Sequence, residues 1–247
     1  MKISVLASGS KGNSTFIEIN NVNILIDLGM SCNYIEKKLK EINVNPETIK
    51  KILITHTHND HICGLPAFYK KYKPKICIMP SMIDSLKPIL GDFTYESYEN
   101  HSDQFALEIL KTSHDSKDSV GFIIDKKIVY ITDTGYLNSK YFDLLKNKEV
   151  YIFESNHDIE MLIDGNYYFG LKQRILSDKG HLSNKDAAKY LAKFIGNNTK
   201  YIFLAHLSED NNTKEKALET LLSYIKKESI KKIIITDQYN RTELIEL

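Results

Sequence analysis

The chain has 247 residues, of which 42% are hydrophobic, and its 33 Lys and Arg residues nearly balance its 32 Asp and Glu residues. This length and composition exclude general disorder and suffice to bury a sizeable core. The formal charge of +1 removes the simple electrostatic argument for a polyanionic partner, so any nucleic-acid contact has to come from a local patch. The longest apolar runs are too short for a bilayer span, which takes roughly 20 apolar residues, so we expect no membrane partner.

Two features of the chain predict a cytoplasmic protein. The apolar stretch Ile3–Ala7 is shorter than the core of a signal peptide and is followed at once by polar residues and glycine. The three cysteines, Cys32, Cys63 and Cys77, form an odd set without metal-type C-x-x-C spacing, which favours reduced thiols over a disulfide frame.

No linker is visible, because the five prolines are scattered and no low-complexity tract separates two halves. We therefore predict one compact domain over residues 1–247. Early in the chain, short β-branched runs predict strands at Ile3–Ala7, Thr15–Ile19, Asn23–Asp27 and Lys51–Thr55. Apolar residues at helical spacing, with Ser31 as a cap, predict an amphipathic helix over Ser31–Ile42.

The rest of the chain mixes both kinds of element. Strands are predicted at Ile76–Met79, Ala106–Lys111, Gly121–Ile124, Ile128–Thr132, Val150–Phe153, Lys200–Leu204 and Lys232–Ile235. Helices are predicted at Leu65–Lys71, Ser81–Leu90, Ser139–Asn147, Asn184–Phe194 and Lys214–Lys227. A layered mixed α/β fold follows, with helices covering stacked sheets.

Three histidines and an aspartate follow one apolar strand, as His56-Thr57-His58-Asn59-Asp60-His61. Residues two apart at a strand end can point to one side, and a turn brings the next two back towards them. Imidazole and carboxylate together suit Zn²⁺ or Mn²⁺, and four ligands within six positions exceed what one tetrahedral ion with an open site would use. The segment therefore predicts two adjacent divalent ions, and we reject the alternative of loop or capping histidines.

Other predicted strands also end in residues of ligand type, namely His114, Asp133 and His206. Taken singly, His114 and His206 could be surface or core histidines, and Asp133 could simply form a turn. Together with the six-residue segment they complete a seven-ligand set. The predicted set is His56, His58 and His114 for one ion, Asp60, His61 and His206 for the other, and Asp133 bridging both.

The order of these motifs resembles that of the metallo-β-lactamase-fold metallohydrolases over nearly the full chain. The resemblance implies an αββα sandwich with the site at one edge. It also implies that Asp27, at the end of an early strand, orients a metal ligand without binding the metal itself. Asp60 is implied both to bind metal and to orient the attacking hydroxide.

Longer strings are similar to the WalJ/YycJ-type family, which is associated with 5′-directed exonuclease action on DNA. They are Leu6–Ser14, Glu154–Asp158, Leu171–Asn184 and Leu204–Asn212. The resemblance implies a 5′-to-3′ DNA exonuclease associated with mismatch repair, with repair proteins as partners.

The spacing from His181 to His206 resembles that of the tRNA-processing members of the superfamily, where such a histidine contacts the scissile phosphate. Glu154 resembles the glutamate that supports it. The resemblance implies that His181 stabilises developing charge or protonates the leaving oxygen, with its pKa raised by the carboxylate. The alternative for His181 is a solvent-exposed histidine at a helix start.

Basic residues gather around His181, since residues 171–200 contain seven of them against two acidic residues. Backbone phosphates are contacted mainly by Lys, Arg and N–H groups, so Lys172, Arg174 and Lys179 are predicted to position a nucleic-acid strand. A glycine-rich turn near the N-terminus can present amides to an anion, which makes Ser10, Asn13 and Ser14 predicted contacts.

Weaker signals come from two polar residues, an aromatic run and a cysteine. Asn156 and His157 lie in a family string and are candidate substrate contacts, but His157 is almost as well explained as an exposed loop histidine. The aromatic run at Tyr167–Phe169 can stack on a base, although core packing is its expected use. Cys63 is expected to pack in an apolar setting at a helix start rather than to bind metal.

The leading hypothesis is a two-metal phosphodiesterase acting on nucleic acid, because two ions can activate water and hold a phosphoryl oxygen. DNA is preferred to RNA because the chain lacks room for the large inserted domain of the related ribonucleases. RNA or cyclic-phosphodiester hydrolysis and glyoxalase-type thioester hydrolysis are the alternatives, but a thioesterase would not call for His181, Glu154 or the basic stretch. A metal-stabilised binding module would predict a broken ligand set, and none of the seven is missing.

Overall fold

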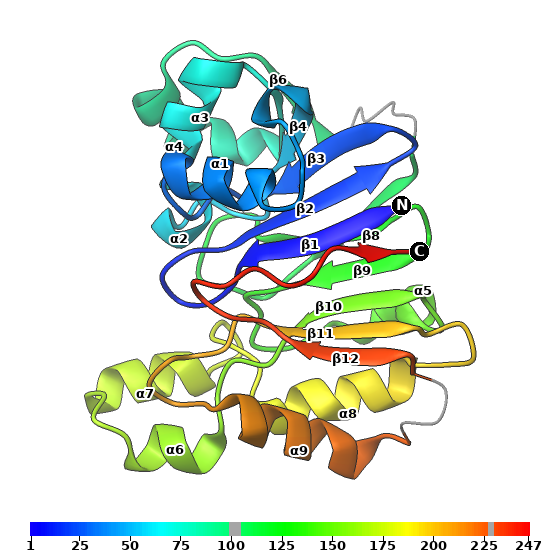
Figure 1. Ribbon diagram of the computed structural model, residues 1–247. Helices are drawn as coiled ribbons and strands as arrows, with labels where there is room; N and C mark the ends of the chain where they lie inside the picture. The colour runs from blue at the N-terminus through cyan, green and yellow to red at the C-terminus, as the bar shows by residue number, and fades with distance from the viewer. Residues whose placement is uncertain (99–104, 227–229) are drawn as a thin grey trace. The chain divides into compact units, whose positions relative to one another are not determined.

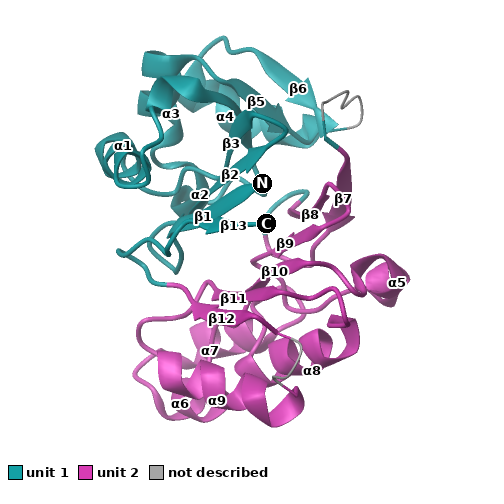
Figure 2. Ribbon diagram, turned by 45° about the vertical axis from the view of Figure 1, so that its right-hand side comes forward, with its two compact units in different colours: residues 1–105, 116–118, 237–247 teal, residues 106–115, 119–236 magenta. Residues whose placement is uncertain are grey.

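The computed structural model describes residues 1–98, 105–226 and 230–247, and the chain divides into two compact units (Figure 2). Unit 1 comprises residues 1–105, 116–118 and 237–247, and unit 2 comprises residues 106–115 and 119–236. Compact units of this kind occur both within single domains and as separate domains, so one domain over 1–247 stays a prediction.

Unit 1 is built on a seven-stranded mixed sheet in the order β13-β1-β2-β3-β4-β5-β6 (Figure 1). Its strands are β1 Lys2–Ala7, β2 Ser14–Ile19, β3 Val22–Ile26, β4 Ile49–Leu53, β5 Lys75–Ile78, β6 Tyr95–Ser97 and β13 Ile245–Glu246. The pairs from β13 to β3 are antiparallel, whereas those from β3 to β6 are parallel. Asn20 and Asn21 connect β2 to β3, and both adopt the left-handed backbone that a two-residue hairpin loop requires.

Helices of unit 1 lie between its parallel strands, because a parallel pair needs a crossover. They are α1 Cys32–Lys40, α2 Asn59–Ile62, α3 Leu65–Tyr72 and α4 Ile83–Leu90, with short 3-10 turns η1 Pro46–Thr48 and η2 Pro80–Met82. The predicted cap of α1 is confirmed, since Ser31 Oγ accepts a hydrogen bond from the N–H of Tyr34. Pro80 starts η2, where its missing N–H costs no hydrogen bond.

Unit 2 is built on a six-stranded mixed sheet in the order β12-β11-β10-β9-β8-β7. Its strands are β7 Leu107–Lys111, β8 Val120–Ile124, β9 Ile128–Ile131, β10 Val150–Glu154, β11 Tyr201–Ala205 and β12 Lys232–Ile235. The pairs from β7 to β9 are antiparallel and those from β9 to β12 parallel. Its helices are η4 Ser139–Tyr141, α5 Phe142–Leu145, α6 Ile159–Asp164, α7 Phe169–Leu176, α8 Asn184–Phe194 and α9 Lys214–Tyr224.

The core of unit 2 forms where α8 and α9 cover one face of its sheet (Figure 1). Alternate strand residues point to this face, as Tyr151 and Phe153 of β10 do, because the side-chain period of a strand is two. They meet Leu191 and Phe194 of α8 and Leu221 of α9. The helical spacing of the apolar residues in α8 thus seats it on the sheet and places its N-terminus beside the loop that carries His181.

Most predicted elements are confirmed, and the exceptions are short. The short strands β6 and β13 and the short helices α2 and α6 were not predicted, and neither was α7. The predicted helix Ser139–Asn147 is η4 followed by α5, while Lys214–Lys227 is helical only to Tyr224, with Lys227 outside the described residues. Among the helices of the described ranges, none is long and apolar enough to cross a membrane.

Replacement of Phe194 by Ala is expected to lower the free energy of unfolding by about 3–5 kcal/mol, because it empties a ring-lined part of the core. The Phe194 ring centroid lies 5.3 Å from that of Phe142 and 6.1 Å from that of Tyr190. Urea unfolding measures the change. Leu222→Ala on α9, where the side chain is 37% exposed, is the control and should cost less than about 1 kcal/mol. Equal losses in both variants would contradict this account of the core.

Candidate metal and phosphate site

Three residues of the candidate site stand just after strands with an unusual backbone conformation. Asp27 follows β3, Asp133 follows β9 and His206 follows β11, with φ angles of 59°, 54° and 57°. Residues other than glycine rarely adopt this left-handed conformation, and it turns the chain sharply. The turn keeps each side chain at the carboxyl end of its strand, where loop residues from neighbouring strands gather.

In unit 1, the buried carboxylate of Asp27 fixes the orientation of His61. Asp27 accepts hydrogen bonds of 2.8 Å from the N–H and from Oγ1 of Thr55, and its Oδ2 lies 2.8 Å from His61 Nδ1. Burial raises the pKa of Asp27, although His61 and Thr55 favour the charged form. Asn13 Nδ2 donates to His61 Nε2 at 3.1 Å, so Nε2 is the unprotonated nitrogen and Nδ1 carries the proton. Unprotonated Nε2 is the form that binds a metal.

The remaining ligand-type residues of unit 1 lie on the same turn. Ligand atoms of His56 and His58 lie within 4.8 Å of each other, and so do those of Asp60 and His61. His56 and His61 are buried, whereas His58 and Asp60 are partly exposed. The sequence predicted a turn that brings Asp60 and His61 back towards the first two histidines. This turn is the short helix α2, in which the N–H of His61 donates to the His58 carbonyl at 2.9 Å.

The glycine-rich turn packs against these residues. Asn13 and Ser14 are buried, and Ser14 Oγ donates to the Asp27 carbonyl, while Ser10 is exposed. The N–H of Asn13 donates to the Asp60 carbonyl at 2.8 Å. A Cβ on Gly29 would lie 1.6 Å from that same carbonyl oxygen, so only glycine fits there. Asn13 and Ser14 therefore support the ligand turn, and their contact with substrate stays a prediction.

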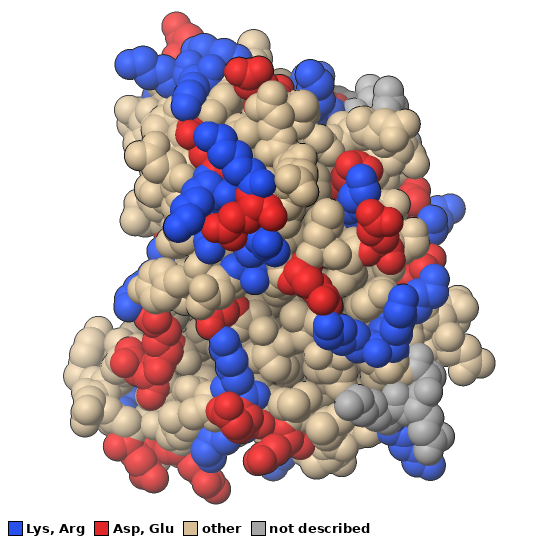
Figure 3. All heavy atoms as spheres, in the orientation of Figure 1, with Lys and Arg blue, Asp and Glu red and all other residues tan. Residues whose placement is uncertain are grey.

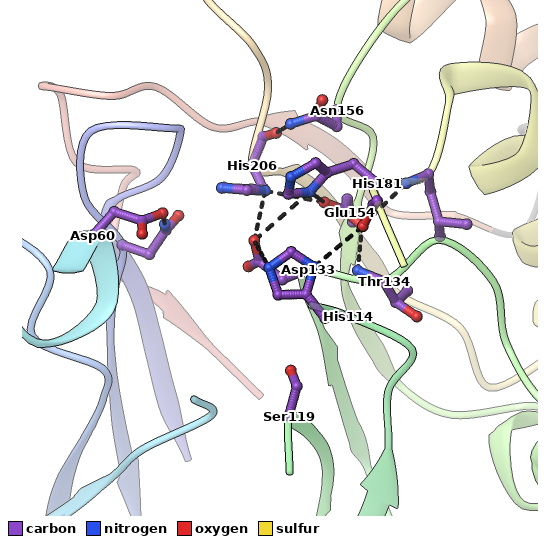
Figure 4. Close-up of polar contacts among 12 residues, drawn as sticks. Asp60, His114, Ser119, Asp133, Thr134, Glu154, Asn156, His181 and His206 are labelled. Atoms are coloured by element: carbon purple, nitrogen blue, oxygen red, sulfur yellow. Dashed lines mark hydrogen bonds and ion pairs between the residues drawn. The ribbon is translucent and has the colours of Figure 1, made fainter. Parts of the chain in front are cut away.

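In unit 2, Glu154 at the end of β10 holds two histidines (Figure 4). Its Oε1 lies 2.8 Å from His181 Nδ1 and 3.0 Å from His206 Nδ1, and its Oε2 accepts hydrogen bonds from two backbone N–H groups. Burial alone would raise the pKa of the Glu154 carboxyl, but His181 and His206 lower it to about 2. A charged carboxylate accepts only, so both Nδ1 atoms carry protons and both Nε2 atoms point away from Glu154.

Asp133 and His114 stand beside this pair (Figure 4). Asp133 Oδ1 lies 3.5 Å from His206 Nδ1 and 3.9 Å from His114 Nε2. Burial lowers the pKa of His114, which favours the neutral imidazole that coordinates metals. His114 Nδ1 lies 3.3 Å from the Gly180 carbonyl oxygen, and Arg174 forms an ion pair with the adjacent Asp115.

The donor types of unit 2 suit a divalent metal, with Nε2 as the coordinating nitrogen of His181 and His206 because their Nδ1 atoms carry the protons held by Glu154. Asp133, Glu154, His181 and His206 each offer a ligand atom, all within 4.8 Å of one another. Mixed carboxylate and imidazole donors suit Zn²⁺ or Mn²⁺. Since Glu154 already accepts four hydrogen bonds, its geometry fits a support of the two histidines better than direct coordination.

The other predicted substrate contacts differ from one another in burial and in hydrogen-bond partners. His157 is 1% exposed, so the alternative of an exposed loop histidine is wrong, and burial lowers its pKa to about 4. Its Nε2 has no hydrogen-bond partner within the described part of the chain. Asn156 is buried and its Nδ2 donates to the His206 carbonyl at 2.9 Å. Lys179 is exposed, and Lys172 Nζ donates to the Ile163 carbonyl.

A buried asparagine network below His206 was not predicted. Asn212 Nδ2 donates to the carbonyls of Ser155 and Asn156 at 2.9 and 3.0 Å, and Ser155 Oγ donates to Asn184 Oδ1 at 2.6 Å. These residues lie within the strings that resemble the WalJ/YycJ-type family, which was the available signal. The network fixes the chain just after Glu154 and the loops next to His181 and His206.

Two expectations about apolar packing are wrong. Tyr168 and Phe169 are each 73% exposed rather than packed in the core. Cys63 is exposed, and its Sγ donates to the Gly29 carbonyl at 2.9 Å. Cys63 lies between α2 and α3, and Tyr168 and Phe169 begin α7, where the chain leaves the core.

Comparison with known proteins gives matches over most of the chain. Residues 7–119 match the family described as the metallo-beta-lactamase superfamily. The chain is 38% identical over 245 residues to exodeoxyribonuclease WalJ of Streptococcus pneumoniae serotype 2 (strain D39 / NCTC 7466), covering 91% of this chain and 88% of that protein. It is 36% identical over 228 residues to exodeoxyribonuclease YycJ of Bacillus anthracis, covering 88% and 86%.

Solved structures extend the likeness in fold. The metallo-beta-lactamase fold protein YhfI from Bacillus subtilis superposes with a TM-score of 0.72 at 16% identity, covering 98% of this chain and 99% of that one. Such low identity speaks for the fold alone. With the two mixed sheets and their helices, these matches confirm the predicted metallo-β-lactamase fold.

Substitution of Asp27 by Asn is expected to weaken metal binding about 10–100-fold, because the carboxylate that sets the His61 tautomer loses its charge. Calorimetric titration of metal-free protein with Zn²⁺ or Mn²⁺ measures the affinity. Asp84→Asn, at an exposed position of α4, is the matched control and should bind as the unaltered chain does. Unchanged affinity in Asp27→Asn would show that Asp27 does not orient a ligand.

Proposed function

The chain belongs to the metallo-β-lactamase superfamily and, within it, to the WalJ/YycJ exodeoxyribonuclease family, and on that premise we propose that it is a metal-dependent exodeoxyribonuclease acting from the 5′ end of DNA. The observation that carries the proposal is 38% identity to a named exodeoxyribonuclease across 91% of the chain. A role in mismatch repair, repair proteins as partners and a cytoplasmic location remain predictions.

The proposal assigns two divalent ions, Zn²⁺ or Mn²⁺, to the seven predicted ligands. His56, His58 and His114 would hold one ion, Asp60, His61 and His206 would hold the other, and Asp133 would contribute to both. The order of these motifs along the chain and the mixed imidazole and carboxylate donors within each unit support the assignment. The Nε2 atom of His61, left unprotonated by Asn13 and Asp27, is the donor that this arrangement requires.

When bound, such ions lower the pKa of water and polarise a phosphoryl oxygen. The residues of the chain then orient the reactants. Asp60 orients the attacking oxygen in this proposal, while Glu154 holds the proton of His181 at Nδ1 and thereby directs Nε2 outward. The side chain of His181 is 19% exposed, so its Nε2 can reach a phosphate and protonate the leaving oxygen. Glu154 acts by fixing the orientation of that imidazole through the contact of 2.8 Å with Nδ1.

Replacement of His58 or Asp60 by Ala is expected to lower the cleavage rate of 5′-phosphorylated duplex DNA roughly 10³-fold or more, because ion binding contributes several kcal/mol to transition-state stabilisation. Removal of metal with a chelator should have the same effect, and added Zn²⁺ or Mn²⁺ should reverse it. Asp84→Ala on α4 should cleave at the unaltered rate. Full activity of Asp60→Ala would refute the assigned centre.

A substrate panel separates the proposed activity from its alternatives. Metal-loaded protein is offered duplex DNA labelled at either end, RNA, a cyclic nucleotide and a thioester, and the products are identified. We expect mononucleotides from the 5′ label at least about tenfold faster than any other product. Faster hydrolysis of RNA or of the cyclic nucleotide would replace DNA as the substrate, and thioester cleavage alone would overturn phosphodiesterase chemistry.

A further inference from the structure

Two aromatic side chains stand exposed at the start of α7, and we call them the α7 platform. Tyr168 precedes the helix and Phe169 begins it, each with 73% of its surface exposed. None of the eight residues of α7, all of them described, is buried. Burial of aromatic rings is favourable, so two neighbouring rings left exposed at a helix start are candidates for a ligand surface.

The C-terminal end of α7 contacts the loop that carries His181. The N–H of His181 donates to the Ile175 carbonyl at 3.0 Å, and the Gly180 carbonyl contacts His114. A Cβ on Gly180 would lie 2.1 Å from the Ile175 carbonyl oxygen, so the turn is tightly packed on the helix end. Ile175 lies six positions after Phe169 in the chain, and at a rise of 1.5 Å per residue the helix advances by about 9 Å between them. This is the length of about two to three stacked nucleotides.

The charges around α7 suit a nucleic-acid strand. Lys172 and Arg174 lie on the helix, which has no acidic residue, and exposed Lys179 follows it. Arg174 is paired with Asp115, and Tyr167 donates to Asp210 at 2.7 Å, so Lys172 and Lys179 carry the argument from charge. Over the face of the molecule in view, which includes the side of α7, Figure 3 shows Lys and Arg interleaved with Asp and Glu. With a net charge of +1, phosphate attraction alone gives limited affinity. Base stacking on aromatic rings would add affinity without reading sequence.

We propose that the α7 platform stacks on unpaired bases of the DNA strand whose end lies at His181. This inference rests on the proposed exodeoxyribonuclease function and names its substrate form, a strand end with at least three accessible bases. Lys172 and Lys179 then lie beside the intervening phosphates. The arrangement favours single-stranded or frayed ends over a fully paired terminus.

The first test measures kinetics with substrates of different length. For a 12-nucleotide 5′-phosphorylated single strand, the double variant Tyr168→Ala with Phe169→Ala should raise KM about tenfold or more. Its rates on a 5′-phosphorylated dinucleotide and on bis(p-nitrophenyl) phosphate should stay within about twofold, because neither reaches the platform. Tyr224→Ala, which removes an exposed aromatic of α9, is the matched control and should leave all three unchanged.

The second test uses fluorescence, since the chain contains no Trp. Phe169→Trp introduces a single Trp, which can be excited at wavelengths where the fifteen Tyr residues do not absorb, and keeps the stacking surface, so its emission should be quenched by the 12-mer and not by the dinucleotide. Quenching in a protein that cleaves no DNA would support the platform and overturn the proposed function. Cleavage by the unaltered chain with no quenching and no KM change would overturn the platform alone. If the unaltered chain self-associates and the double variant does not, the surface binds a second copy of the chain, and this result would also overturn the platform.

Discussion

In each unit, the candidate ligands depend on a buried carboxylate that holds the Nδ1 proton of an imidazole. Asp27 does this for His61, and Glu154 does it for His181 and His206. An uncompensated buried carboxylate is costly, and here backbone N–H groups and the Thr55 hydroxyl satisfy its remaining lone pairs. The fixed tautomers leave Nε2 as the outward atom. Side chains that would otherwise rotate are thus set in place before any ligand arrives.

The two units use the same strand plan to position these carboxylates. In each, three antiparallel strands lead into three parallel ones, and an aspartate with a left-handed backbone follows the third strand. These are Asp27 after β3 and Asp133 after β9. The first parallel strand then ends in the histidine turn in unit 1 and in Glu154 in unit 2. At the point in each sheet where antiparallel pairing changes to parallel pairing, the loops at the carboxyl ends of the strands leave room for such side chains.

The sequence predicted those parts of the site that are local. The histidine turn is a run of six residues, and the strands before it are short apolar and β-branched runs, so ligand types and strand ends could be read together. The asparagine network could not, because Asn212 contacts Ser155 and Asn156 only after β10 and β11 pair. The exposure of Tyr168 and Phe169 was missed because an aromatic run usually means burial, and only tertiary structure shows that α7 leaves the core. The strands β6 and β13 were missed because they depend on pairing with distant partners.

The pairing of β13 with β1 has a consequence for synthesis on the ribosome. Unit 1 begins with residues 1–105 but takes residues 237–247 to cover the outer edge of its sheet, through the β1–β13 pair and the bond from Ser4 Oγ to the Thr242 carbonyl. From the end of β1 at residue 7 to the start of β13 at residue 245, synthesis adds 238 residues, so at about 5–20 residues per second β1 has an open edge for roughly 12–48 seconds. An unpaired strand edge is a template for aggregation, so this interval is when the emerging polypeptide most needs a chaperone.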